Sequence, residues 1–171
     1  MRTELTYGIA AGLGISLWVF IEFLLDLHDQ HLEIGQFTGY LSTIIPIACI
    51  YLGLKEKGGQ LSPGPLTLQQ GLTTGLIISL FSGIITTAFF LIYYHFINPG
   101  WRQTAEDFER SQWEHTGMPE EEIALQIEQL KFLNSDTGVI IFNMISSLVL
   151  GMIISFFMTL FLRRQEKAQE E

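Results

Sequence analysis

The chain has 171 residues, of which 48% are hydrophobic and 16% charged, and its formal net charge at neutral pH is −9. This length accommodates one domain, and the acidic balance argues against nucleic acid as a partner because no basic face is available to replace counterions on phosphates. The single cysteine, Cys49, excludes an intrachain disulfide.

The apolar residues are gathered in four long blocks. A helix rises about 1.5 Å per residue, so about 20 apolar residues cross a hydrocarbon core of roughly 30 Å. Lipid offers the backbone no hydrogen-bond partner, so each block is predicted to be a helix. We expect an all-α fold, a four-helix transmembrane bundle that forms a single membrane domain over residues 1–171 in the lipid bilayer. The blocks cover residues 6–25, 37–54, 71–97 and 138–162.

Small residues recur at four-residue spacing in these blocks. This spacing lets helix backbones approach closely, which matters in lipid because apolar burial between helices gains little there. We interpret the stripes as packing faces within one chain, with a homo-oligomer face as the alternative, and we expect the third block to be central. The predicted packing glycines are Gly8, Gly12, Gly35, Gly39, Gly71, Gly75, Gly83 and Gly151.

Glu22 is the one acid inside a predicted span. A charge at mid-bilayer costs about 2.5–3.5 kcal/mol on insertion scales, which makes such a residue a functional candidate. Glu22 lies about one turn from the predicted outer boundary, so a structural hydrogen bond and an ion or proton role both stay open. In the connection that follows, His28 and His31 could face one metal ion if that segment is helical. No metal-binding motif frames them, and a solvated connection is the alternative.

Pro46 lies within the second block and is predicted to kink that helix near residues 43–45 because it lacks a backbone donor. Either a fixed structural kink or a broken-helix binding site would explain it. The loop of residues 55–66 is rich in turn-forming residues. After it, Thr67 is predicted to cap the third helix, with Gln70 completing a capping box.

The third block ends at Asn98 and Pro99, with His95 just before them. The imidazole of His95 titrates near neutral pH, so His95 and Glu22 offer a possible proton-titrating pair near the outer surface. Nothing in the sequence places these two residues in contact.

Residues 98–137 are predicted to form two short amphipathic helices, an α-helical hairpin outside the membrane. Pro119 suits the first turn of the second helix, and the glutamates at 120–122 suit its positive end. An apolar stripe follows, and it would either cover the outer end of the bundle or receive a partner protein. The stripe consists of Ile123, Ile127, Leu130 and Leu133.

Six of the nine Lys and Arg residues flank one side of the predicted spans. The positive-inside rule therefore places both termini in the cytoplasm. An even number of spans, here four, also requires both termini to lie on the same side of the membrane. These six residues are Arg2, Lys55, Lys57, Arg163, Arg164 and Lys167.

Several short segments together resemble a known family. The stretch from Tyr93 to Pro99 is the most specific, and it is supported by Tyr7-Gly8, by residues 35–40, by Gly71 with Gly75 and by residues 119–124. On these residues the chain resembles the bacterial domain-of-unknown-function family 4199, small four-span integral membrane proteins. The resemblance implies a bacterial inner-membrane location. It supplies no reaction, so no active-site residue is carried over.

We find no catalytic motif in the sequence and expect a non-enzymatic accessory or scaffold subunit without a cofactor or a resident metal. Its helices or its outer hairpin would contact a membrane protein partner or a second copy. The alternative is a small transporter or an ion- or proton-conducting oligomer that uses Glu22 and His95. The candidate functional residues are Glu22, Pro46, His95, Asn98 and Pro99.

Overall fold

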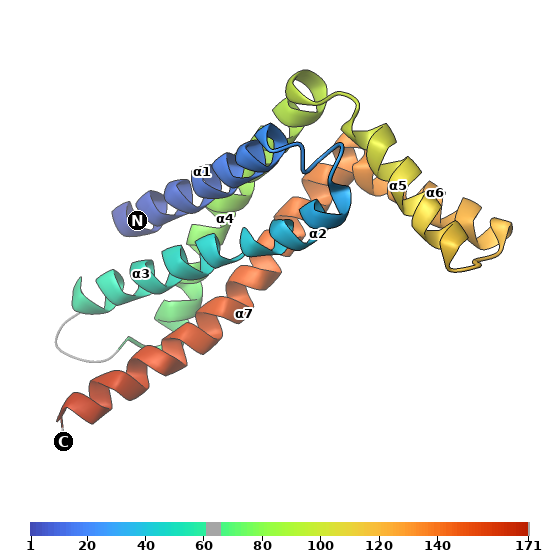
Figure 1. Ribbon diagram of the computed structural model, residues 1–171. Coiled ribbons are helices and arrows are strands. Elements are labelled where there is room, and N and C mark those ends of the chain that lie inside the picture. Colours follow the sequence, from blue (N-terminus) through green and yellow to red (C-terminus); the bar gives the residue numbers. More distant parts are fainter. Residues whose placement is uncertain (61–65, 171) are drawn as a thin grey trace.

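The computed structural model describes residues 1–60 and 66–170, and all of the regular elements in these two ranges are helices (Figure 1). The all-α prediction is therefore confirmed. Four helical segments, Arg2–Leu24, Leu32–Gln60, Leu68–Ile97 and Asp136–Gln165, are long and apolar enough to cross a membrane. In chain order the elements are α1 (Arg2–Leu24), α2 (Leu32–Leu41), α3 (Ile44–Gln60), α4 (Leu68–Ile92), η1 (Tyr93–Ile97), α5 (Trp101–His115), α6 (Glu120–Asn134) and α7 (Asp136–Glu170).

The second apolar segment is broken between α2 and α3, close to the predicted kink. Pro46 lies in the first turn of α3, where its missing donor is tolerated. Ser42 and Thr43 form the turn, and their backbone N–H groups donate to Gly39 and Tyr40 at 3.2 and 3.1 Å. This tightened turn changes the direction of the segment and separates two helices that the sequence predicted as one kinked span.

The second helical segment extends beyond its predicted block, residues 37–54, at both ends. α2 begins at Leu32, ahead of the apolar block, and Glu33 in its first turn suits the positive end of a helix. α3 continues to Gln60, although residues 55–60 were predicted to be turn-forming. Side-chain contacts to α1 hold this last part of α3 in place. Lys57 pairs with Glu4 at 2.8 Å, and the Glu56 carboxylate accepts hydrogen bonds from Thr3 and Tyr7.

The rest of the predicted inner loop, residues 61–65, lies outside the described residues. At its far end the capping box forms as predicted. The Thr67 hydroxyl accepts from the Gln70 backbone N–H at 3.2 Å, and the Gln70 side chain accepts from the Thr67 N–H at 2.9 Å. The start of α4 is therefore fixed by its own sequence.

α4 is the central helix, and it packs against α1, α3 and α7. On the side of α1, a Cβ atom added to Gly8 would lie 2.6 Å from the Phe81 Cβ, and one added to Gly12 would lie 2.7 Å from the Ile85 Cβ. The two backbones approach so closely that only glycine fits at these positions.

The α4–α7 interface is built from small residues on both helices. Gly71 faces Thr159, Gly75 faces Ser155, Gly83 faces Ser147 and Gly151 faces Ser79. The hydroxyls mostly bond to their own helix; those of Ser155 and Thr159 each donate to the carbonyl four residues earlier at 2.6 Å. The Ser147 hydroxyl instead donates across the interface to the Ser79 carbonyl at 2.7 Å. Backbone proximity and hydroxyl pairing therefore join α4 to α7.

The two glycines of α2 differ from this pattern. A Cβ atom at Gly35 would collide with the Leu27 carbonyl, which belongs to the α1–α2 connection and not to another helix. A Cβ atom at Gly39 would meet nothing within 4 Å. The helix packing predicted at these two positions is thus not present, because α2 contributes no buried residue.

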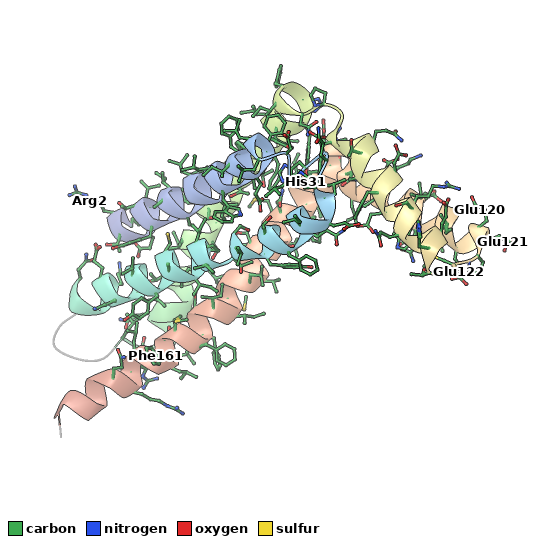
Figure 2. The ribbon with its side chains drawn as sticks, viewed as in Figure 1. Arg2, His31, Glu120, Glu121, Glu122 and Phe161 are labelled. Atoms are coloured by element: carbon green, nitrogen blue, oxygen red, sulfur yellow. The ribbon has the colours of Figure 1, made fainter. Side chains whose placement is uncertain are left out.

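α5 and α6 lie side by side and project from one end of the bundle (Figure 1), and we call residues 101–134 the α5–α6 arm. Arg110 pairs with Glu120, and Lys131 pairs with Glu106 at 3.8 Å, so ion pairs connect the two helices. Of the predicted apolar stripe, Ile123 is buried, Ile127 and Leu130 are half-buried and Leu133 is exposed. Figure 2 shows Glu120, Glu121 and Glu122 at the far end of the arm and Arg2 at the opposite end of the molecule.

Candidate functional site

A cavity of about 620 Å³ lies between α1, the α2–α3 segment, α4 and α7. It exists because α2 stands away from the bundle and because Gly39 and Pro46, which line it, leave space. Much of the lining is apolar, but α4 and α7 also contribute hydroxyl groups. The lining includes Ala11, Glu22, His28, Gly39, Pro46, Ile47, Thr86, Phe90, Tyr93 and Trp101.

A chain of polar contacts leads from one end of this cavity to the surface. Glu22 is buried, and its Oε2 lies 3.6 Å from His28 Nε2. His28 Nδ1 lies 2.6 Å from the Tyr93 hydroxyl, which in turn accepts from Asn98 Nδ2 at 3.3 Å. Asn98 also donates to Asp29 Oδ1 at 3.5 Å, and Asp29 is exposed. We call Glu22, His28, Tyr93, Asn98 and Asp29 the polar chain.

The polar chain has a consistent direction of hydrogen bonding. Because the Tyr93 hydroxyl accepts from Asn98, its own proton is free to be donated to His28 Nδ1. A neutral His28 then carries its proton on Nε2, the nitrogen nearest to Glu22. Burial lowers the pKa of His28, and the opposing effects of Glu22 and Asp29 are smaller, so the neutral ring is the form favoured near neutral pH.

Two local irregularities of the backbone bring these residues together. Asp26 has a left-handed conformation with φ of 56°, which aspartate tolerates better than most residues, and it ends α1 in a turn that returns His28 toward Glu22. At the end of α4 the helix widens into the π-helical turn η1, where the Asn98 N–H donates to the Tyr93 carbonyl at 2.8 Å. Single π-turns of this kind are often found at functional sites.

Two buried polar atoms of the cavity wall have no hydrogen-bond partner among the described residues. They are Oε1 of Glu22 and Oγ1 of Thr86, and the two side chains are 3% and 8% exposed. A buried polar group without a partner costs about 1–3 kcal/mol. The wall of this cavity therefore contains polar groups that the described protein does not satisfy.

Comparison with known proteins gives a family but no activity. Residues 6–164 match the model of a family described as a protein of unknown function (DUF4199). The chain belongs to this family. No curated protein and no solved structure matches it. The predicted family membership is thereby confirmed, and the family description assigns no role to any residue of this DUF4199 member.

The structure separates the two residues that the sequence suggested as a titrating pair. Glu22 lies beside His28, whereas His95 Nε2 contacts both carboxylate oxygens of Asp136 at 3.0 and 3.1 Å. Arg102 also pairs with Asp136, at 2.5 Å, and its guanidinium lies over the Tyr94 ring. His95 thus belongs to the base of the α5–α6 arm in this DUF4199 protein.

The other predicted residues fall in different places. Pro46 lines the cavity, Asn98 joins the polar chain and Pro99 is exposed. His28 points inward. His31 is exposed and precedes the first residue of α2 (labelled in Figure 2). Among the side chains that the structure describes, in residues 1–60 and 66–165, no group of three or more His, Cys, Asp or Glu could hold a metal ion.

Sequence reasoning missed the central members of the site. The sequence suggests His28 only as a possible metal ligand and Tyr93 only as part of a family stretch, yet the two residues form the middle of the polar chain. Trp101 is a further such residue, since its ring centroid lies 4.9 Å from that of His28 and it lines the cavity. The sequence offered one indication of this site: His28, Tyr93 and Trp101 all lie at or just beyond the outer ends of predicted spans.

Proposed function

We propose that this DUF4199 protein is an integral membrane protein with four spans, α1, α2–α3, α4–η1 and α7, and with both termini in the cytoplasm. The N-terminus and the ends of α3 and α7 lie at the same end of the bundle (Figure 1), and six of the nine Lys and Arg residues are in or next to these segments. Lys and Arg favour the cytoplasmic side. The α5–α6 arm then lies outside the cytoplasm.

The orientation is tested by cysteine labelling in the Cys49→Ser background. Gln112 in the arm and Gly59 near the end of α3 are both exposed. A membrane-impermeant maleimide applied to intact spheroplasts should label Gln112→Cys and spare Gly59→Cys until the membrane is permeabilised. The reverse pattern would overturn the proposed orientation.

We further propose that the protein is a non-enzymatic accessory subunit that binds a small molecule with an apolar chain in its cavity and contacts a partner protein through its arm. The cavity is the observation that supports this function. Its volume suits a small ligand. Trp101, the first residue of the arm, lines the same cavity, so an occupant would touch the base of the arm directly.

The arm offers surface to a partner. Leu125 and Phe132 are 55% and 59% exposed on α6, and the arm projects from the bundle in Figure 1. A photoreactive side chain at Phe132 should give an adduct of defined mass in membranes, and one at Phe161, which is 50% exposed on α7, should not. Adducts only of twice the chain mass would instead indicate a second copy, and no adduct would contradict the arm's role.

Occupancy of the cavity can be measured with tryptophan fluorescence. In a Trp18→Phe, Trp113→Phe background, Trp101 is the only tryptophan, and 1-bromooctane in phosphatidylcholine nanodiscs quenches it on contact. Gly39→Phe should fill the cavity without colliding with the protein, because a Cβ atom there meets nothing within 4 Å. Gly59→Phe, which also projects into open space, is the matched control.

We expect strong quenching with Gly59→Phe and weak quenching with Gly39→Phe. Equal quenching in the two variants would mean that the bromine reaches Trp101 from the surrounding lipid, and the proposed ligand site would fall.

Proton transport is a second candidate, supported by the polar chain. This chain runs from buried Glu22 through His28, Tyr93 and Asn98 to exposed Asp29, and ionisable residues inside membranes commonly mark proton relays. In proteoliposomes with an internal pH dye, proton flux should then exceed that of empty liposomes. Glu22→Gln should abolish the excess, and Glu33→Gln, at an exposed position, should retain it. Flux equal to that of empty liposomes would remove this candidate.

A further inference from the structure

The chemistry of the cavity wall restricts which molecule can occupy it. Among the described lining residues, Glu22 is the only acid and none is Lys or Arg. His28, its nearest titratable neighbour, is favoured in its neutral form because burial lowers its pKa. The carboxyl group of Glu22 therefore has no cationic side chain beside it among the described lining residues.

Glu22 also has unused hydrogen-bonding capacity. One carboxylate oxygen, Oε2, faces His28 at 3.6 Å, while Oε1 is buried and has no partner among the described residues. A carboxylate accepts hydrogen bonds and cannot donate any. A hydrogen-bond donor would satisfy Oε1, and a cationic donor forms the strongest such bond with a carboxylate.

Aromatic rings and hydroxyls surround the same end of the cavity. Tyr93, Trp101 and Phe90 line it, and the faces of aromatic rings attract organic cations. Thr86, whose hydroxyl also has no partner among the described residues, lies in the same wall. The rest of the lining is largely apolar and includes Ala11 and Ile47.

We propose that the cavity binds a single-chain amphiphile with a protonated primary amine, whose ammonium group contacts Glu22 and whose hydrocarbon chain lies toward Ala11 and Ile47. This proposal rests on the ligand-binding function proposed above. An aminophospholipid carries the same ammonium group beside a phosphate, and the lining residues offer no cation to hold that phosphate. A free amphiphilic amine is therefore the occupant that fits.

The test compares three probes with the same chain and different head groups: octylammonium, 1-octanol and octanoate. Each competes with 1-bromooctane for the cavity in the Trp101-only protein at pH 7.5, with concentrations expressed per lipid to correct for partitioning. Octylammonium should relieve the quenching at a concentration about tenfold lower than 1-octanol, since a hydrogen bond to a charged group discriminates by about that factor. Octanoate should be the weakest competitor.

The variants assign this preference to Glu22. Glu22→Gln should bring octylammonium and 1-octanol within about twofold of each other, whereas Glu33→Gln, which removes an exposed charge at the start of α2, should keep the tenfold difference. Adding phosphatidylethanolamine to the nanodiscs should not raise the concentration of octylammonium that relieves the quenching.

Each contrary outcome has a distinct meaning. Equal competition by octylammonium and 1-octanol in the unmodified site would overturn the amine proposal and leave the apolar ligand site intact. A preference that survives Glu22→Gln would overturn the role of Glu22. Competition by phosphatidylethanolamine would assign the ammonium to a lipid head group. Absence of bromooctane quenching that depends on Gly39 would remove the ligand site itself.

Discussion

The two sides of α4 are built differently. Toward α1 and α7 it meets glycines, serines and threonines at contact distance, and Gly8, Gly75 and Gly151 leave no room for a Cβ atom. Toward α2 it faces the cavity, and the glycine there, Gly39, has no neighbour within 4 Å. The same residue type at the same four-residue spacing thus accompanies a tight interface on one side and an open space on the other. Spacing alone indicates where close approach is possible, and packing decides where it happens.

The largest expected effect comes from blocking the tight side. Gly75→Leu would place a side chain where Ser155 already lies, and we expect it to lower the free energy of unfolding by about 2–3 kcal/mol through overpacking. The measurement is SDS-induced unfolding in mixed micelles. Gly39→Leu is the matched control and should not destabilise the protein. Equal losses in both variants would contradict the contrast between the two sides.

The difference between the sides also explains what the sequence could predict. The apolar blocks, the break before Pro46 and the capping box at Thr67 are encoded by local patterns, and each is present in the structure. The polar chain is not local. It depends on the left-handed turn at Asp26 and on the π-turn at Tyr93, which set the rotation of two helix ends relative to each other. No sequence pattern predicts either irregularity, so the direction in which the side chains at these helix ends point cannot be predicted.

The pairing of Glu22 was mispredicted for this reason. His95 and His28 are both histidines at the outer ends of predicted spans, and periodicity does not distinguish which one faces α1. The structure places His95 beside Asp136 at the arm and His28 beside Glu22. The family match likewise gives a membership without a reaction.

The second prediction concerns the junction between the open side and the surface. Tyr93→Phe removes the hydroxyl that connects His28 to Asn98 and leaves polar groups of both without that partner. We expect a loss of about 1–3 kcal/mol in the free energy of unfolding, measured in the same way. Tyr40→Phe, at an exposed position of α2, should change it little. A Tyr93→Phe protein as stable as the wild type would mean that the polar chain contributes nothing to the fold.

The third prediction uses the titration of His28. Burial depresses its pKa below the ordinary value of 6.5, so the native state binds fewer protons than the unfolded state below that pH. The stability that His28 contributes is complete above about pH 6.5 and is lost as the pH falls through its depressed pKa.

Unfolding measured at pH 7.5 and 5.5 tests this. The wild type should lose stability on acidification, His28→Gln should lose less, and His31→Gln, at an exposed position, should behave like the wild type. The groups that face His28 are Glu22, Asp29 and Tyr93, and they are unchanged in both variants. The same pH dependence in His28→Gln and in the wild type would assign the titration to other residues.

The smallest expected effect comes from the open side of α4. Gly39→Ala adds a methyl group that meets no atom within 4 Å and replaces glycine inside a helix, where alanine is favoured by about 0.5–1 kcal/mol. The free energy of unfolding should therefore rise by that amount, whereas Gly75→Ala should lower it. If the cavity holds a ligand, the methyl group of Gly39→Ala raises the stability but reduces the cavity volume. 1-Bromooctane should then quench Trp101 less in that variant. A gain in stability with unchanged quenching would mean that Gly39 lies at the edge of the occupied space, and that the ligand contacts α4 and α7 more than α2.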